Sequence, residues 1–465
     1  MRKNTYNYNC KVIKGEERKL SHSEVMVLIM KRMTKQMLTV FLAMCMLASC
    51  AAKPDPVETA AEGTGAVSTE NKNDINISQP ASPEPLEMTK YFGQQTEWDE
   101  EILLAFSEYS GADLSDAEKA EYPALSSVLA ETRNMLVRSM EDEYDNLLAD
   151  AKDDLAFLGA DSFVTKESVV DEQIRRADSV AVSLLTESFL VYGNIYGRYM
   201  NGTTYDTETG KQLKISDVIA DMSDIPAIVK KELQSHMWNG YFSSDTAVED
   251  YFRDTSEDGI RWTLDYNGVT FYFAGGDVAE YTEGPLVATV TFAEYPELFH
   301  EKYMAAPEAY IVELPLEYSF LTDLDGDGTS EELYIVPFSE ETGYEAIGIY
   351  TDTDTNYYYT EFPALTMYRT GGYNPYYVKT ADGRHYLYIF ADGNELASHD
   401  MKLRVIDITG GEFREVGDMY AAPGYIPVDC SYALTDPDNM MLENFETQQE
   451  AVLYCIGSDG MPVLK

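Results

Sequence analysis

Cysteine, histidine and basic residues are scarce in this chain of 465 residues, and each scarcity argues against certain classes of function. Lys and Arg number 34 against 81 Asp and Glu, which gives a formal net charge of −47. Because such a surface repels the phosphates of nucleic acids, we expect no nucleic-acid partner, whereas cationic partners and metal ions are favoured. Only Cys430 and Cys455 follow residue 50. They are a candidate disulfide closing a loop of about 25 residues, and two free thiols are the alternative.

The few histidines limit the catalytic chemistry that the chain can offer. A serine or cysteine triad needs a histidine base. Beyond residue 50 the chain has only His236, His300, His385 and His399, none of them beside a recognisable nucleophile motif. Each is expected on the surface or packed in the interior. Glycan hydrolysis by a pair of carboxylates remains an alternative, because the distance between two such carboxylates depends on the fold. We therefore expect a binding module rather than an enzyme, and assign no catalytic residue.

A short apolar run near the N-terminus follows three basic residues between positions 31 and 35. The run, Met37 to Leu47, has about 11 residues, or roughly 16 Å of helix, which is too short to span a hydrocarbon layer of ~30 Å. It therefore predicts a cleaved export leader. The run closes on Leu47-Ala48-Ser49-Cys50, which resembles the lipobox of bacterial lipoproteins. That resemblance implies that Cys50 carries a lipid anchor and that the chain beyond it faces outside on the cell membrane. An ordinary secretory leader with an incidental cysteine is the alternative.

The predicted leader, residues 1–50, divides the chain into segments of different character. Residues 1–29 fit no leader anatomy, and we expect that an upstream start codon was chosen. Residues 51–88 are rich in Pro, Ala, Glu, Ser, Thr and Asn, which predicts a disordered tether of about 38 residues spanning ~35 Å. Residues 1–50 contribute +6 to the net charge of −47, so the remainder carries −53. Residues 89–310 and 311–465 are expected to form two domains.

In the first of these domains, stretches with the apolar spacing of a helix are followed by stretches with the alternating pattern of strands. Ser115 and Glu118 form a capping-box pattern, and apolar residues then recur at helical spacing from Leu125 to Leu148. Together with the elements that follow, they predict an α+β domain of helices and antiparallel strands. The further expected elements are a strand from about Val169, a strand end and turn at 205–210, a strand at Leu213 to Ile215, a helix from Ser223 to about Met237, a hairpin of strands 261–266 and 269–273 about Asn267-Gly268, a strand at 286–292 and a helix at 296–303.

Several short stretches of this domain keep a specific order and spacing. They are Arg176-Ala177-Asp178-Ser179 with Ser183, Tyr205-Asp206-Thr207-Glu208-Thr209-Gly210-Lys211 with Leu213 and Asp217-Val218, Phe271-Tyr272-Phe273, Ala279 with Tyr281 and Gly284, and Glu294-Tyr295 with Leu298-Phe299. Over about 210 residues, from Tyr91 to Met304, the chain resembles the extracytoplasmic domain shared by the RsiV type of anti-sigma factor and the PdaC type of peptidoglycan deacetylase. The resemblance implies a ligand-binding or sensory role at the cell envelope, with wall material or a wall-attacking protein such as lysozyme as ligand.

The chain departs from that family in three respects. Tyr192 to Gly197 stands where family members often carry a Gly-Gly-Ala-His segment, which puts any role of that histidine in doubt. The acid-rich metal motif of polysaccharide deacetylases is absent. The leader is of the lipoprotein type and not a cytoplasmic sigma-binding segment with a membrane span. We therefore expect neither deacetylase nor anti-sigma activity.

An acidic loop between two expected strands, Tyr318 to Leu321 and Leu333 to Val336, has the spacing of a calcium ligand set. Residues 323–331 place carboxylates at positions 1, 3, 5 and 9, and Gly328 at the sharp turn. Ca²⁺ takes about six to eight oxygens, and this spacing wraps them around one point. With strands on both sides, the loop resembles those of integrin-type propeller blades. A solvated acidic turn is the alternative. The predicted Ca²⁺ ligands are Asp323, Asp325, Asp327, Thr329 through its carbonyl, and Glu331.

Beyond the loop the chain is rich in β signals and aromatic residues, which predicts a mostly β C-terminal domain after the helix-plus-sheet domain. An exposed aromatic strip could stack on sugar rings, whereas cross-strand packing is the commoner use of tyrosine in sheets. The partners expected for the whole chain are the membrane, through lipidated Cys50, and peptidoglycan or a cationic wall-active protein. The aromatic residues are Tyr357 to Tyr359, Tyr373, Tyr376, Tyr377, Tyr386, Tyr388 and Phe390.

Overall fold

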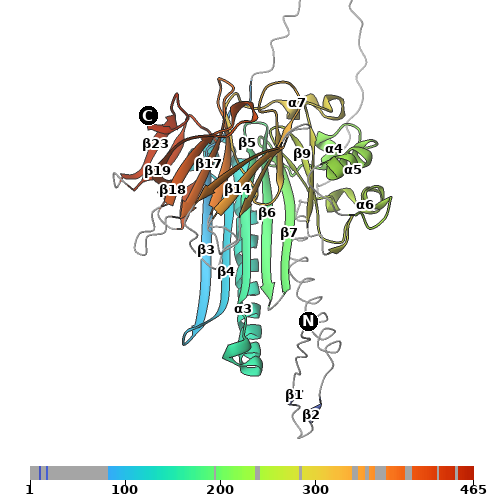
Figure 1. Cartoon of the computed structure of the whole chain (residues 1–465), viewed down its shortest axis with the longest axis vertical. Coiled ribbons are helices and arrows are strands. Elements are labelled where there is room, and N and C mark those ends of the chain that lie inside the picture. Colours follow the sequence, from blue (N-terminus) through green and yellow to red (C-terminus); the bar gives the residue numbers. More distant parts are fainter. Residues whose placement is uncertain are drawn as a thin grey trace, which may run out of the picture. The chain divides into compact units, whose positions relative to one another are not determined.

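The structure is a computed structural model of the chain (Figure 1), which divides into two compact units, Met1–Lys53 and Pro54–Lys465. In the first unit the strands β1 (Cys10–Lys11) and β2 (Glu17–Arg18) pair antiparallel. Cys50, the rest of the predicted leader and residues 51–81 of the predicted tether lie outside the described residues. No helix in the described part of the chain is long and apolar enough to cross a membrane. Besides β1 and β2, the structure describes residues 82–192, 195–235, 241–281, 285–337, 344–350, 355–361, 373–392, 401–426, 429–445 and 449–465.

A seven-stranded sheet is the largest element of the first predicted domain (Figure 1). Its neighbours are antiparallel except β4 and β5, which are parallel. Parallel neighbours need a crossover connection, and helices α2 (Asp116–Glu121) and α3 (Pro123–Leu158) supply it. In spatial order the strands are β20 (Tyr425–Ile426), β21 (Cys430–Tyr432), β3 (Met88–Asp99), β4 (Ile102–Leu114), β5 (Lys166–Ala177), β6 (Ala181–Tyr192) and β7 (Ile195–Asp206).

Helix α3 packs on one face of this sheet through the apolar stripe that the sequence predicts. Leu125 and Leu129 join Ile174 of β5 in one hydrophobic cluster, and Leu136 and Met140 join Val170 of the same strand in another. The helix continues beyond the predicted end at residue 148 and stops at Leu158, after which Gly159 takes a φ of +75°. Helix α3 runs along the strands of this sheet (Figure 1) and packs on β4 and β5.

The start of this helical region is confirmed, but its capping box is only half formed. The Ser115 hydroxyl accepts a hydrogen bond from the Glu118 backbone N–H at 3.4 Å. The Glu118 carboxylate accepts instead from the Glu87 N–H at 3.2 Å, and the Ser115 N–H donates to the Glu87 carbonyl. Residue 87 precedes β3, so the cap ties the helix start to the sheet.

A three-stranded sheet and four helices contribute to a second core in the same predicted domain. The helix predicted from Ser223 and the strand predicted at 286–292 are confirmed as α5 (Ile225–Ser235) and β10 (Leu286–Thr291). The strand predicted at Leu213 to Ile215 is wrong. There the Asp217 carboxylate accepts the Lys214 N–H at 2.9 Å and starts the helical turn α4 (Ile215–Val218), while Leu213 is buried in the core. The remaining elements are α6 (Ala247–Asp254), a 3₁₀ turn (Glu257–Gly259), and, in place of one helix at 296–303, a 3₁₀ turn (Pro296–Leu298) and α7 (Glu301–Met304).

The hairpin predicted at Asn267-Gly268 is confirmed. Its strands β8 (Trp262–Leu264) and β9 (Gly268–Phe273) are antiparallel, with Leu264 opposite Val269. Neither turn residue takes the positive φ that this dipeptide favours. Gly268 is needed for another reason, since a Cβ there would lie 2.3 Å from the Val290 carbonyl oxygen on β10. The glycine therefore permits the close approach of two strands.

The C-terminal region is mostly β, as predicted, and forms a four-stranded and an eight-stranded sheet. One core, which includes Phe320 and Leu387, lies between them. The strands flanking the acidic loop are confirmed as β12 (Ser319–Thr322) and β13 (Glu331–Pro337), followed by β14 (Tyr344–Tyr350) and β15 (Thr355–Glu361). The larger sheet has the order β11 (Tyr310–Glu313), β16 (Tyr373–Lys379), β17 (His385–Asp392), β18 (Met401–Asp407), β19 (Arg414–Pro423), β22 (Met440–Asn444), β23 (Gln449–Ile456) and β24 (Pro462–Leu464), with a 3₁₀ turn at Thr409–Gly411.

Five of the aromatic residues singled out in the sequence are packing residues. The tyrosines at 376, 377, 386 and 388 and Phe390 are buried. The Tyr376 and Phe390 rings meet edge to face, with centroids 5.7 Å apart. The side chains of Tyr357 to Tyr359, on β15, lie outside the described residues. Cross-strand packing, and not a sugar platform, is thus the use of the buried rings.

The C-terminal region also completes the first sheet. Strand β21 pairs with β3, where Cys430 lies opposite Tyr91, and the Thr435 hydroxyl donates to the Leu86 carbonyl at 2.7 Å. The two regions expected to meet at residue 310 therefore share a sheet, and both belong to the unit Pro54–Lys465.

Gly202 offers a test of how the three-stranded sheet packs on β7. A Cβ at Gly202 would lie 1.8 Å from the Trp262 carbonyl oxygen of β8. Gly202→Ala should therefore lower the free energy of unfolding by about 3 kcal/mol, because backbone must move to admit a methyl group. Gly417→Ala on β19 is the control, since its Cβ would meet only Met461 at 3.5 Å. Urea unfolding of both variants measures the difference, and equal stabilities would contradict the close approach.

Candidate functional site

The acidic loop joins the antiparallel neighbours β12 and β13. Asp323, Asp325 and Asp327 each bring a carboxylate oxygen within 4.8 Å of the others. Asp323 is half-buried, and the other two aspartates are exposed. Leu324 is buried, and its carbonyl accepts a hydrogen bond from the Gly410 N–H at 2.9 Å. The loop backbone is thus fixed to the protein, while its carboxylates converge at the surface.

Backbone amides inside the loop orient these carboxylates. Asp323 accepts hydrogen bonds from the Gly326 N–H at 2.7 Å and the Gly328 N–H at 3.0 Å. Asp325 and Asp327 each accept from the N–H two residues further on, at 3.0 and 2.7 Å. Gly326 and Gly328 have φ values of +79° and +91°, which side chains rarely allow. The predicted role of Gly328 at the sharp turn is therefore confirmed.

Glu331 and Thr329, the other predicted ligands, differ from the three aspartates in their placement. Thr329 is exposed. Glu331 is buried where β13 begins, and its carboxylate accepts the Leu324 N–H at 2.7 Å. Burial raises the pKa of Glu331, the hydrogen bond from Leu324 acts against that shift, and the nearby aspartates raise the pKa further. The carboxylates thus repel one another, and a bound cation would relieve that repulsion.

The donor set of the loop fits a hard cation. Carboxylate oxygens are the ligands that Ca²⁺ prefers, and the convergent group contains no nitrogen or sulfur ligand that would select a softer metal. Exposed carboxylates also gather in solvated turns, and this geometry agrees with both alternatives. The Ca²⁺ site therefore stays a prediction.

Two of the four histidines lie in the described part of the chain. His300 is exposed just before α7, whereas His385 on β17 is buried. Burial lowers the pKa of His385 to about 4, so its ring is neutral at neutral pH. The Tyr377 hydroxyl lies 2.6 Å from Nδ1 of His385 and 3.0 Å from the Thr322 hydroxyl. His385 is thus a packed residue, as expected, while His236 and His399 lie outside the described residues.

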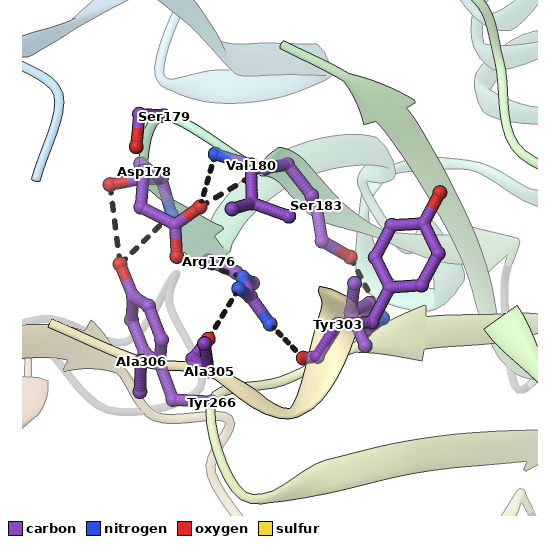
Figure 2. A network of polar contacts seen from close by, with 12 residues as sticks. Arg176, Asp178, Ser179, Val180, Ser183, Tyr266, Tyr303, Ala305 and Ala306 are labelled. Carbon is purple, nitrogen blue, oxygen red and sulfur yellow. Dashed lines mark hydrogen bonds and ion pairs between the residues drawn. The ribbon is translucent and has the colours of Figure 1, made fainter. Parts of the chain in front are cut away.

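The stretch Arg176 to Ser179, part of the family resemblance, forms a buried polar network (Figure 2). The Arg176 guanidinium donates to the Asp178 carboxylate at 2.9 Å and to the carbonyls of Tyr303 and Ala305 at 2.7 Å each. The other Asp178 oxygen accepts the N–H groups of residues 180 and 181, at 2.8 and 3.0 Å. All of these hydrogen bonds are formed within the chain, between groups of the protein itself. This stretch therefore connects the turn between β5 and β6 to the C-terminal end of α7.

A second buried ion pair lies next to the first and was not predicted from the sequence. The Arg175 guanidinium binds both carboxylate oxygens of Asp265, at 3.1 and 2.8 Å, and donates to the Glu313 carbonyl at 2.8 Å. Both side chains are 2% exposed. The sequence around the two arginines, Asp171 to Ser179, is mostly polar and carries no signal that they are buried.

The predicted disulfide is not formed. Cys430 and Cys455 are both free thiols. Cys430 lies on β21 of the seven-stranded sheet and Cys455 on β23 of the eight-stranded sheet, so each is held by a different set of strands. The alternative of two free thiols is what the structure has.

Arg176 provides a test of the buried network. Arg176→Met should lower the free energy of unfolding by about 3 to 5 kcal/mol, because it leaves the Asp178 carboxylate buried without its partner. Arg253→Met, which removes an exposed ion pair with Asp254 on α6, should be near neutral. Chemical unfolding at pH 7 measures both. A loss at Arg176 no larger than that at Arg253 would show that the network does not stabilise the fold.

Comparison with known proteins finds no family model and no curated protein that matches the chain. Among solved structures, the chain is similar to two crystal structures of DUF3298 family members, from Bacteroides fragilis and Pseudomonas aeruginosa. Both are 12% identical to this chain and cover 48% of it. The Bacteroides match spans 96% of that protein with a TM-score of 0.34, and the Pseudomonas match spans 98% with a TM-score of 0.32. Similarity at this level decides neither the fold nor the function of this chain.

Proposed function

We propose that this chain is a lipid-anchored binding module on the outer face of a bacterial cell membrane. Its ligand would be cell-wall material or a cationic wall-associated protein such as lysozyme. The observation that carries the proposal is the order of segments in the sequence. A short apolar run closes on Cys50, a stretch rich in proline and serine follows, and an acidic remainder carrying −53 comes last.

The acidic balance supports a cationic ligand. A net charge of this size attracts basic proteins over distances of about 8 Å at 0.15 M salt, beyond which the interaction is screened. Attraction of this general kind is lost as salt rises, whereas contacts in a packed interface persist. The salt dependence of binding therefore separates a specific ligand from a counter-ion effect.

A co-sedimentation experiment tests the proposal. The chain beyond Cys50 should be retained by peptidoglycan, by immobilised lysozyme, or by both, at 0.15 M as well as 0.02 M salt. Turnover of the glycan, measured on the same samples, should be absent. Release at 0.15 M salt would mean that net charge alone explains retention. Glycan turnover without stable binding would favour the alternative, a hydrolase that acts through paired carboxylates.

We also propose that the acidic loop binds Ca²⁺ as a structural ion. The affinity should fall near that of extracellular modules, with a Kd of ~0.1 to 1 mM. The ion would neutralise the convergent Asp323, Asp325 and Asp327 and hold the connection between β12 and β13. Its effect would be on stability, because the loop backbone is already anchored through Leu324.

Calorimetry tests the calcium site directly. At 10 mM Ca²⁺ and a Kd of ~0.5 mM, binding should stabilise the folded chain by about 2 kcal/mol. Asp325→Asn should abolish the gain, because it removes one of the three convergent carboxylates. Asp161→Asn, in the 3₁₀ turn Ala160–Ser162, makes the same charge change elsewhere and should keep the gain. An unchanged melting temperature of the wild type on adding Ca²⁺ would exclude the site.

A further inference from the structure

At the start of β5, helix α3 covers one face of the seven-stranded sheet, and the described side chains on the other face are partly exposed. In the first six residues of β5, from Lys166 to Asp171, buried and half-buried side chains alternate. Ser168 and Val170 are buried, and Val170 packs on α3. Glu167, Val169 and Asp171 point to the opposite face and are half-buried, and the Asp171 side chain is 35% exposed. Figure 1 shows α3 running along these strands.

The strand registers define which side chains share this second face, which we call the open face. Opposite residues of neighbouring strands lie on the same side of a sheet. Starting from Asp171 and Val169 on β5, the pairings extend the open face to β4 and β3 on one side and to β6 and β7 on the other. The described residues on this side include Lys90, Phe92 and Gln94 on β3, Phe106, Glu108 and Ser110 on β4, Glu167, Val169, Asp171 and Gln173 on β5, Glu187, Phe189 and Val191 on β6, and Arg198 on β7.

Two carboxylates stand directly opposite each other on this face. Asp171 of β5 is paired with Glu187 of β6, an arrangement that like charges make unfavourable. Lys90 lies 3.3 Å from Asp171, and Arg198 forms an ion pair with Glu187. Both bases are shared with further carboxylates, Lys90 with Glu313 at 3.0 Å and Arg198 with Glu317 at 2.7 Å. The two internal cations are thus divided among four carboxylates.

Gln173 is a second, independent indication that the face lacks a hydrogen-bond donor. It follows Asp171 on the same side of β5 and is only 6% exposed. Its amide nitrogen donates to the Glu187 carboxylate at 3.4 Å, which fixes the orientation of the amide. Its carbonyl oxygen is buried and has no hydrogen-bond partner. A buried acceptor without a donor costs about 1 to 3 kcal/mol, so a donor that entered between Asp171 and Glu187 would be stabilised.

We propose that the open face is the docking surface for a basic, extended polypeptide segment, an inference that rests on the proposed binding function. Counting Glu313 and Glu317, the face carries six carboxylates against two basic side chains. A lysine or arginine side chain of the ligand would donate to Gln173. Val169 and Phe189, which are opposite each other, offer apolar contact to its intervening residues. Carboxylates repel anionic lipid and nucleic acid, so neither competes for this surface.

Binding of a labelled model peptide tests the open face. The probe is a twelve-residue peptide that repeats Lys-Thr-Lys-Val, and its counterpart carries glutamate in place of lysine. The wild-type chain beyond Cys50 should bind the lysine peptide at 0.15 M salt and the glutamate peptide at least tenfold more weakly. Glu167→Lys should weaken binding of the lysine peptide tenfold or more, and Glu167→Gln about threefold. Gln173→Leu should also weaken binding, because it removes the acceptor.

The matched control is Glu131→Lys, which makes the same charge change at an exposed position of α3, away from the open face. It should change the affinity less than twofold. An equal loss in Glu131→Lys and Glu167→Lys would overturn the inference, as would no binding by the wild type. If Glu167→Lys does not fold, as judged by thermal unfolding, the Glu167→Gln and Gln173→Leu variants decide. Retention of Glu167→Lys by peptidoglycan or lysozyme would leave the proposed function intact and reject only this surface.

Discussion

Two adjacent arginines on β5 tie the seven-stranded sheet to the three-stranded and the eight-stranded sheets. Arg175 binds Asp265, at the end of β8, and the carbonyl of Glu313, at the end of β11. Arg176 binds Asp178 and the carbonyls of Tyr303, in α7, and Ala305, just after it. The pairing of β5 with β6 is irregular between Ile174 and Arg176, and a bulge of this kind re-aims side chains. The bulge therefore lets consecutive arginines reach partners in different parts of the fold.

Burying two guanidinium groups costs several kcal/mol each unless every donor finds an acceptor. Apart from Asp178, the acceptors come from residues far from the arginines in the sequence, so the cost is recovered only when these parts of the fold are assembled. Separating β8 from β5 would leave Asp265 without its counter-charge. The ion pairs thus oppose partial unfolding more strongly than they raise the total stability. Strand β21, which pairs with β3, adds a backbone connection of the same long-range kind.

Local features of the sequence predicted local parts of the structure. The stripe of α3, the hairpin at Asn267-Gly268 and the convergence of the loop aspartates all depend on residues a few positions apart, so spacing was sufficient. The strand expected at Leu213 to Ile215 failed because a carboxylate at Asp217 starts a helical turn there. The pairing of β21 with β3 could not be predicted, because nothing in the sequence of either strand indicates which strand it pairs with. The partner of Arg175 could not be predicted either, because the polar stretch around it gives no sign that the arginine is buried.

Carboxylates serve three different physical purposes in this chain, which is why net charge alone does not define a site. Asp178 and Asp265 are buried and fully matched by arginine, so they contribute to folding and are closed to ligands. The loop aspartates converge within 4.8 Å, a spacing that suits a single small cation. On the open face, Asp171 and Glu187 are opposite each other on paired strands and share their internal cations with other acids. The carboxylates of this face are distributed over several strands, which suits the separated cationic groups of a polypeptide. The arrangement of the carboxylates and their internal partners, more than their number, therefore decides which ligand each place can take.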